Sequence, residues 1–166
     1  MAYTAKDYEK ALHIYKQLKD KAASMERRQL AKTGMLRSAH MLGNEEEIIF
    51  TATDLLADTK LAPELSNEAH YYRAKAYLDA GKTDGAMEDL KILAKDTRNV
   101  YGAEAKYKVA QIYFDGGQTD KAEQEVLNYI EVSTPHTYWL ARSFVLLADV
   151  YMKLGRNLDA KHICFH

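Results

Sequence analysis

The small and apolar residues of this chain recur in one pattern that is repeated three times. In each copy an alanine is followed by tyrosine three residues later, by glycine seven residues later and by a second alanine twelve residues later. The copies are Ala74–Tyr77–Gly81–Ala86, Ala110–Tyr113–Gly117–Ala122 and Ala148–Tyr151–Gly155–Ala160. Four residues beyond the second alanine stands Leu90, Val126 or Cys164. A repeat of this kind decides the fold before any other feature does.

The spacing within each copy predicts a pair of helices. Two residues three apart lie on one helical face, so the alanine allows close helix approach and the tyrosine fills the space beyond it. The glycine suits a left-handed residue that ends the first helix. Asp84 and Asp120 suit the first turn of the second helix, where negative charge is favoured. Each copy is therefore a helix–turn–helix hairpin that buries its apolar side only by stacking on its neighbours.

These residues resemble the tetratricopeptide repeat family, whose pattern has small residues at its eighth and twentieth positions and an aromatic residue at its eleventh. A degenerate repeat precedes the clear ones, with Leu36, Ala39 and Gly43 in the places of Ala74, Tyr77 and Gly81. The predicted organisation is a single domain over residues 1–166, with a half repeat at 5–24, a degenerate repeat at 27–58 and clearer repeats at 62–97, 100–133 and 136–166, the last incomplete. The resemblance implies an all-α fold: an α–α superhelix, or solenoid, of about nine helices in stacked antiparallel pairs.

The repeats are longer than the family norm. The glycines are 38, 36 and 38 residues apart, whereas the usual period is about 34. We expect the extra residues near 58–66, 96–102 and 133–138, between the repeats. Such lengthening is similar to repeats of bacterial cell-envelope scaffolds, which slightly favours the periplasm or envelope over the cytoplasm. Neither end reads as a polar capping unit, so we expect a piece of a longer array.

Composition excludes several classes of protein. Hydrophobic residues make up 47% and charged residues 28%, which argues against disorder. A net charge of -1 argues against a nucleic-acid partner, which would favour a basic excess. No apolar run is long enough to span a bilayer, so we predict that the chain is not membrane-embedded.

Sequence motifs for catalysis are missing. The chain has no glycine-rich phosphate loop, serine nucleophile elbow or zinc-protease motif, so we predict no catalytic residue, no cofactor and no enzyme. His162, Cys164 and His166 have spacing that could hold a metal ion. However, Cys164 occupies an inward apolar position of the repeat, where a free cysteine packs as a small hydrophobe. We therefore predict no metal site.

The resemblance implies a concave surface built from the second, fifth, sixth, ninth, twelfth and thirteenth positions of each repeat. From these positions we select twelve candidate partner-binding residues: Arg37, His40, Tyr71, Tyr72, Lys75, Asp79, Tyr107, Lys108, Gln111, Phe114, Arg142 and Asp149. Aromatic rings beside mixed charges suit a peptide-binding groove. For Tyr71 and Tyr107 the alternative of packing repeat against repeat stays open.

The predicted function is a scaffold that binds a protein or peptide segment in this groove. The alternative is a structural spacer, or a module that self-associates through its uncapped ends, with no groove ligand. A carboxylate clamp, the family's lysine–asparagine set for acidic chain termini, is disfavoured because no asparagine occupies a ninth position. The residues do not identify the partner.

Overall fold

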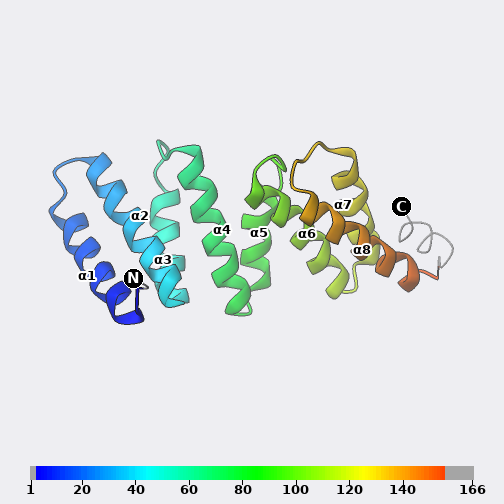
Figure 1. Ribbon diagram of the computed structural model, residues 1–166, viewed down its shortest axis with the longest axis horizontal. Coiled ribbons are helices and arrows are strands. Elements are labelled where there is room, and N and C mark those ends of the chain that lie inside the picture. Colours follow the sequence, from blue (N-terminus) through cyan, green and yellow to red (C-terminus); the bar gives the residue numbers. More distant parts are fainter. Residues whose placement is uncertain (1–2, 156–166) are drawn as a thin grey trace. The chain divides into compact units, whose positions relative to one another are not determined.

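A computed structural model describes residues 3–155, and every regular element among them is a helix. The helices are α1 (Ala5–Lys21), α2 (Met25–Leu42), α3 (Glu45–Leu56), α4 (Pro63–Asp79), α5 (Thr83–Leu93), α6 (Val100–Asp115), α7 (Thr119–Glu131) and α8 (Thr137–Lys153) (Figure 1). The predicted all-α repeat fold is confirmed, with eight helices in the described residues against about nine expected. The chain forms two compact units, unit 1 (Met1–Asp89) and unit 2 (Leu90–His166), each described by itself below.

Unit 1 is built from neighbouring helices that pack side by side. Helix α1 packs on α2, α2 on α3 and α3 on α4, and α2 also contacts α4. The core of this unit takes its buried residues from three helices: Leu36 and Ala39 of α2, Ile48, Ala52 and Leu55 of α3, and Ala69 and Ala76 of α4. Helices α2 and α4 are the first helices of consecutive repeats.

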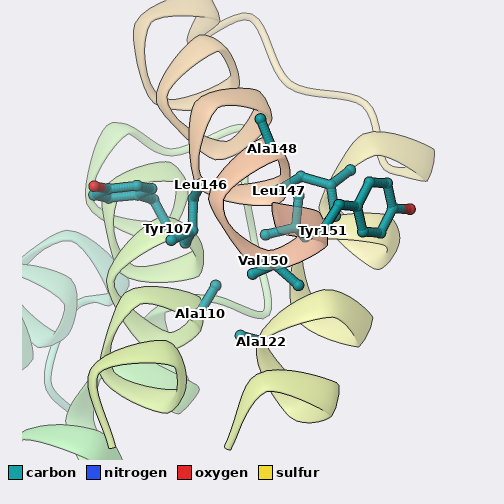
Figure 2. Close-up of a cluster of buried hydrophobic side chains, with 9 residues drawn as sticks. Tyr107, Ala110, Ala122, Leu146, Leu147, Ala148, Val150 and Tyr151 are labelled. Atoms are coloured by element: carbon teal, nitrogen blue, oxygen red, sulfur yellow. The ribbon is translucent and has the colours of Figure 1, made fainter. Parts of the chain in front are cut away.

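Unit 2 repeats this arrangement with α6, α7 and α8, each of which contacts the other two. Figure 2 shows its core, in which Ala110 of α6 and Ala122 of α7 occupy the small-residue positions of the pattern. Leu146, Leu147 and Val150 of α8 complete this core. The alanines keep the helix axes close, and the larger side chains fill the space that remains.

The glycines of the pattern end the first helix of each hairpin. Gly81 has φ of +73° and Gly117 has φ of +77°, a left-handed conformation that glycine adopts without steric cost. After Gly117, the Gln118 backbone N–H donates to the Tyr113 carbonyl over 2.8 Å, as in a Schellman cap. The predicted helix ends are therefore confirmed. Asp84 and Asp120 lie in the first turns of α5 and α7, as expected.

The ranges in which the extra residues are expected cover the connections between hairpins and the first residues of α4, α6 and α8. In unit 2 the connections at 94–99 and 132–136 are joined to each other. Thr97 Oγ1 donates to the Ser133 carbonyl over 3.2 Å, and Thr134 Oγ1 donates to the Thr97 carbonyl over 2.8 Å. His136 Nε2 donates to the Arg98 carbonyl over 2.9 Å. These bonds hold the two connections against one another.

Two sequence expectations lie outside the described residues: the second alanine of the last copy, Ala160, and the histidine–cysteine cluster at 162–166. Among the helices of residues 3–155, none is both long and apolar enough to cross a membrane.

Candidate partner-binding surfaces

The twelve candidate residues lie on the first helices of the repeats and form two surfaces, one in each unit. The α2/α4 surface of unit 1 comprises Arg37, His40, Tyr71, Tyr72, Lys75 and Asp79. The α6/α8 surface of unit 2 comprises Tyr107, Lys108, Gln111, Phe114, Arg142 and Asp149. The two are described separately.

On the α2/α4 surface, a bidentate ion pair joins the two helices. Arg37 Nε donates to Glu68 Oε1 over 2.7 Å, and Arg37 Nη2 donates to Glu68 Oε2 over 2.9 Å. Arginine and carboxylate geometries match in this fork, which adds orientation to the attraction between charges. The exposed Arg37 guanidinium thus already has a carboxylate partner within the chain.

Aromatic rings continue from this ion pair along the same surface. The His40 ring stacks on Tyr72 with centroids 4.2 Å apart, and Tyr72 lies 5.9 Å from Tyr71. Lys75 Nζ lies 5.2 Å from the centre of the Tyr71 ring. Burial, reinforced by the charge of Lys75, lowers the pKa of His40, and Glu68 only partly opposes this. The His40 ring is therefore neutral at pH 7 and stacks as an aromatic ring.

The sequence left open whether Tyr107 binds a partner or packs repeat against repeat. In the structure, Tyr107 of the α6/α8 surface packs in the core. Its side chain is only 5% exposed and belongs to the core of unit 2 (Figure 2). The Trp139 ring lies 5.6 Å from it. Tyr107 is therefore not an exposed anchor, although its hydroxyl accepts a hydrogen bond from Arg142 Nη2 over 3.1 Å.

Arg142 is exposed and surrounded by aromatic side chains. Its guanidinium carbon lies 4.9 Å from the centre of the Tyr107 ring, 5.9 Å from Tyr138 and 5.8 Å from Trp139. Arg142 Nη1 donates to the Tyr138 hydroxyl over 3.2 Å. Stacking of this kind fixes a guanidinium while leaving its edge accessible.

The remaining candidates of the α6/α8 surface differ in exposure. Lys108, Gln111 and Phe114 of α6 are half-buried, and Phe114 packs against the core of unit 2. Asp149 of α8 is exposed. The candidate set omitted Tyr138 and Trp139, which precede Arg142 by four and three residues. Residues three and four apart share a helical face, so this spacing was the signal that could have found them.

Several acidic side chains, a residue type found in catalytic and metal sites, form ion pairs that connect the two helices of a hairpin. Lys32 pairs with Asp54 over 2.9 Å, and Lys106 pairs with Glu125 over 2.9 Å. In the repeat between them, Arg73 and His70 both bind the buried Asp89. Within residues 3–155, no group of three or more histidine, cysteine or acidic side chains could hold a metal ion.

Comparison with known proteins identifies the repeat. A tetratricopeptide repeat family model matches residues 68–96, which span most of α4 and all of α5. No curated protein sequence matches the chain. Because the family match and the pattern of the other hairpins agree, the fold is that of a class generally made up of non-enzymatic protein–protein interaction scaffolds.

Solved structures share this fold at low sequence identity. The crystal structure of MamA aligns with a TM-score of 0.72 and 19% identity, covering 95% of this chain and 85% of that chain. A Podosopora anserina structure, described as putative kinesin light chain nearly identical TPR-like repeats, aligns with a TM-score of 0.66 and 18% identity, covering 96% and 84%. The matched repeat at residues 68–96 and the glycine-ended hairpins of the same pattern elsewhere support a tetratricopeptide repeat assignment, and the chain shares its fold with these structures.

Proposed function

We propose that this chain is a scaffold that binds segments of a partner protein on its α2/α4 and α6/α8 surfaces. The observation that carries the proposal is the aromatic row on the α2/α4 surface. There His40, Tyr72 and Tyr71 follow one another at 4.2 and 5.9 Å. All three rings are half-buried; the His40 ring stacks on Tyr72, and the Tyr71 ring is tilted against Tyr72.

Such a row is suited to a peptide. Tyrosine rings offer a large contact area and lose little conformational entropy when they are covered. Lys75 and Asp79 lie one turn apart on α4 and supply opposite charges for the polar groups of a bound segment. Aromatic centres with polar rims are the arrangement that protein interfaces favour.

An array of random, amide-capped dodecapeptides tests this proposal with the full chain. The surface variant is Tyr71→Ala combined with Tyr138→Ala, because Tyr138 is an exposed ring of α8 that contacts Arg142 of the α6/α8 surface. The matched control is Phe50→Ala, which removes an exposed ring of α3 outside both surfaces. We expect the wild-type chain and the Phe50→Ala control to bind the same subset of peptides, and the double variant to lose most of that subset. Binding of no peptide by the wild-type chain, or identical binding by all three proteins, would contradict the proposal.

A second candidate is self-association through the face between α1 and α2. A hollow of about 550 Å³ opens there, lined by Tyr8, Tyr15, Leu30, Gly34 and Met41 among others. Leu30 is 69% exposed and Met41 is 55% exposed. Exposed apolar residues gathered on one face often mark a protein contact.

Analytical ultracentrifugation of the full chain distinguishes this candidate. Self-association predicts a wild-type dimer or larger species, and a monomer for the Leu30→Glu, Met41→Glu variant. Phe50→Glu is the control, since it adds the same charge at an exposed apolar position outside this face. A wild-type chain that stays monomeric at high concentration would rule the second candidate out.

A further inference from the structure

The helix pair α1/α2 is packed differently from the corresponding pairs later in the chain. There, a second helix and the first helix that follows it are both contacted by the preceding first helix. Helix α2 contacts both α3 and α4, and α6 contacts both α7 and α8. Within residues 3–155, α1 contacts α2 and no other helix. No helix of this range covers the α1/α2 pair as α6 covers α7 and α8.

The repeat register shows that α1 is a second helix. Ala11 comes 25 residues before the pattern of the next repeat begins at Leu36, and Ala122 comes 26 residues before the corresponding alanine. In α7, Ala122 and Val126 are buried in the core to which α6 contributes. Ala11 and Tyr15, at the same two positions of α1, are half-buried and line the α1/α2 hollow. Positions that a first helix covers in unit 2 are thus partly uncovered in α1.

The exposed residues of α2 tell the same story from the other side of the hollow. Leu30, Glu68 and Arg142 each stand six residues before the pattern of their own repeat begins. Glu68 pairs with Arg37 of the preceding first helix, and Arg142 donates to Tyr107 of the preceding first helix. This register position therefore contacts a first helix wherever one precedes it in the described residues. In α2 the position holds Leu30, which is exposed and lines the hollow.

The lining of the hollow suits an amphipathic helix. Its volume is about 550 Å³, and its apolar lining includes Tyr8, Leu30 and Met41. Helices α1 and α2 approach closely there, because a Cβ atom at Gly34 would overlap the Tyr15 ring. A helix with one apolar stripe covers such a surface with side chains three and four residues apart. The hollow is thus the place at which α2 and α6 pack on their own neighbours.

The charged lining residues and the state of the other first helices indicate where the occupant comes from. Asp7 and Arg37 are exposed among the lining residues and offer both signs of charge to the polar sides of a helix. Helices α2 and α4 already contribute to the core of unit 1, and α6 and α8 to the core of unit 2. A second copy of the chain would have to unpack one of these first helices to supply it. A helix of another protein carries no such cost.

We propose that the α1/α2 hollow binds one amphipathic helix of a partner protein, which packs on α1 and α2 as α6 packs on α7 and α8. Of the α2/α4 surface, the hollow shares only Arg37. The inference therefore goes beyond the proposed function and does not depend on the aromatic row. The second candidate above fills the same hollow with a second copy, and the experiment separates the two occupants.

The test uses a displayed library of sixteen-residue peptides built on α6 (Val100–Asp115), selected against the full chain. The library keeps the polar residues of α6 and varies its buried positions among apolar residues. Each selected peptide has a twin of the same composition in shuffled order, which removes the apolar stripe. Binding of labelled peptides is measured by fluorescence anisotropy. The hollow variant is Leu30→Glu combined with Met41→Glu, and the matched control is Phe50→Glu, which adds the same charge at an exposed apolar position of α3.

We expect selected peptides to bind the wild-type chain and Phe50→Glu equally, and the hollow variant at least about tenfold more weakly, because two carboxylates would be buried under the apolar stripe. The shuffled twins should bind at least about tenfold more weakly than the selected peptides. Isolated helices of this length are marginal in water, so circular dichroism of the mixture should show more helix than the two components measured separately. The Tyr71→Ala, Tyr138→Ala variant should bind as the wild-type chain does, which separates this inference from the proposed function.

Other outcomes overturn the inference. Selection of no peptide, or equal binding by the wild-type chain and the hollow variant, excludes the hollow as a helix site. Equal binding of the shuffled twins shows that no helical stripe is recognised. A wild-type dimer in the ultracentrifuge that the hollow variant converts to a monomer assigns the hollow to a second copy instead. Loss of binding in the Tyr71→Ala, Tyr138→Ala variant alone assigns the peptides to the aromatic surfaces of the proposed function.

Discussion

At the scale of single residues, Asp89 shows how a buried carboxylate can be part of a repeat core. Its side chain is 1% exposed and accepts hydrogen bonds from Arg73 Nε over 2.9 Å, Arg73 Nη2 over 2.7 Å and His70 Nδ1 over 2.7 Å. Arg73 also donates to Thr53 of α3 over 3.0 Å. One side chain of α4 thus connects the second helices of two repeats. Buried ions of this kind persist only when each is fully paired.

Replacing Asp89 by asparagine should lower the free energy of unfolding by about 3 kcal/mol at pH 7, because the Arg73 charge loses its buried partner. Urea unfolding followed by circular dichroism measures the change. Glu88→Gln is the control, since the neighbouring Glu88 is exposed. We expect it to alter stability by less than about 0.5 kcal/mol. Equal stability of the wild-type chain and Asp89→Asn would show that the ion pair contributes nothing.

The same pair predicts how stability depends on pH. Burial alone would raise the pKa of Asp89, but hydrogen bonds from His70 and Arg73 outweigh it and hold the pKa below its ordinary value. The folded chain therefore favours the ionised carboxylate. This contribution is complete above the unfolded pKa of about 3.9 and is lost as the pH falls through the folded pKa. The stability difference between wild type and Asp89→Asn should shrink accordingly below about pH 4, in urea titrations made at each pH.

Residue types alone did not reveal this pair or the role of Tyr107. Asp89 lies between Glu88 and Leu90 in a helix, where an acidic residue commonly faces solvent. Only the position of α4 beside α5 places Arg73 and His70 around it.

Tyr71 and Tyr107 stand at the same register position, three residues before the small residue of the pattern. Yet Tyr71 is half-buried, whereas Tyr107 is covered in the core of its unit. Exposure depends on the neighbouring helix, which the local pattern does not describe.

At the scale of elements, the sequence predicted hairpins and their ends well because their cause is local. A glycine ends each first helix, seven residues after the alanine of the pattern or, for Gly43, after Leu36, and Gly43, Gly81, Gly117 and Gly155 all have the left-handed conformation. The mutual hydrogen bonds of the two connections in unit 2 were not predictable in this way. They join Thr97 to residues 36 and 37 positions later in the sequence, and no short-range pattern encodes a contact of that range.

Packing of α6 against the preceding connection depends on Gly102. A Cβ atom at this position would overlap the Asp96 carbonyl oxygen and lie 2.6 Å from the Leu93 carbonyl oxygen. Backbone atoms cannot turn away as a side chain can, so Gly102→Ala should destabilise the chain by about 2 kcal/mol or more. Gly116→Ala is the matched control. The added Cβ there would lie no closer than 3.2 Å to a neighbouring atom, and φ is an ordinary -82°. Thermal unfolding that ranks the two variants equally would contradict this account of the element.

At the scale of the whole molecule, each unit has its own hydrophobic core. One core is formed by α2, α3 and α4, and the other by α6, α7 and α8. Helical repeats contact mainly their nearest neighbours, so their stability is close to a sum of local terms. Regions with separate cores can unfold locally, and the free energy of local unfolding differs from one region to another.

A matched pair of leucine substitutions tests whether the two cores respond separately. Leu55 in unit 1 and Leu147 in unit 2 are each 2% exposed, and replacement of either by alanine should remove about 2–5 kcal/mol of local stability. Hydrogen exchange followed by mass spectrometry resolves the response by helix. We expect Leu55→Ala to speed exchange in α2, α3 and α4 while α6, α7 and α8 keep most of their protection, and Leu147→Ala to give the converse. If either substitution speeds exchange equally in all six helices, the chain unfolds as one cooperative body, and binding at one surface would then be coupled to the stability of the other.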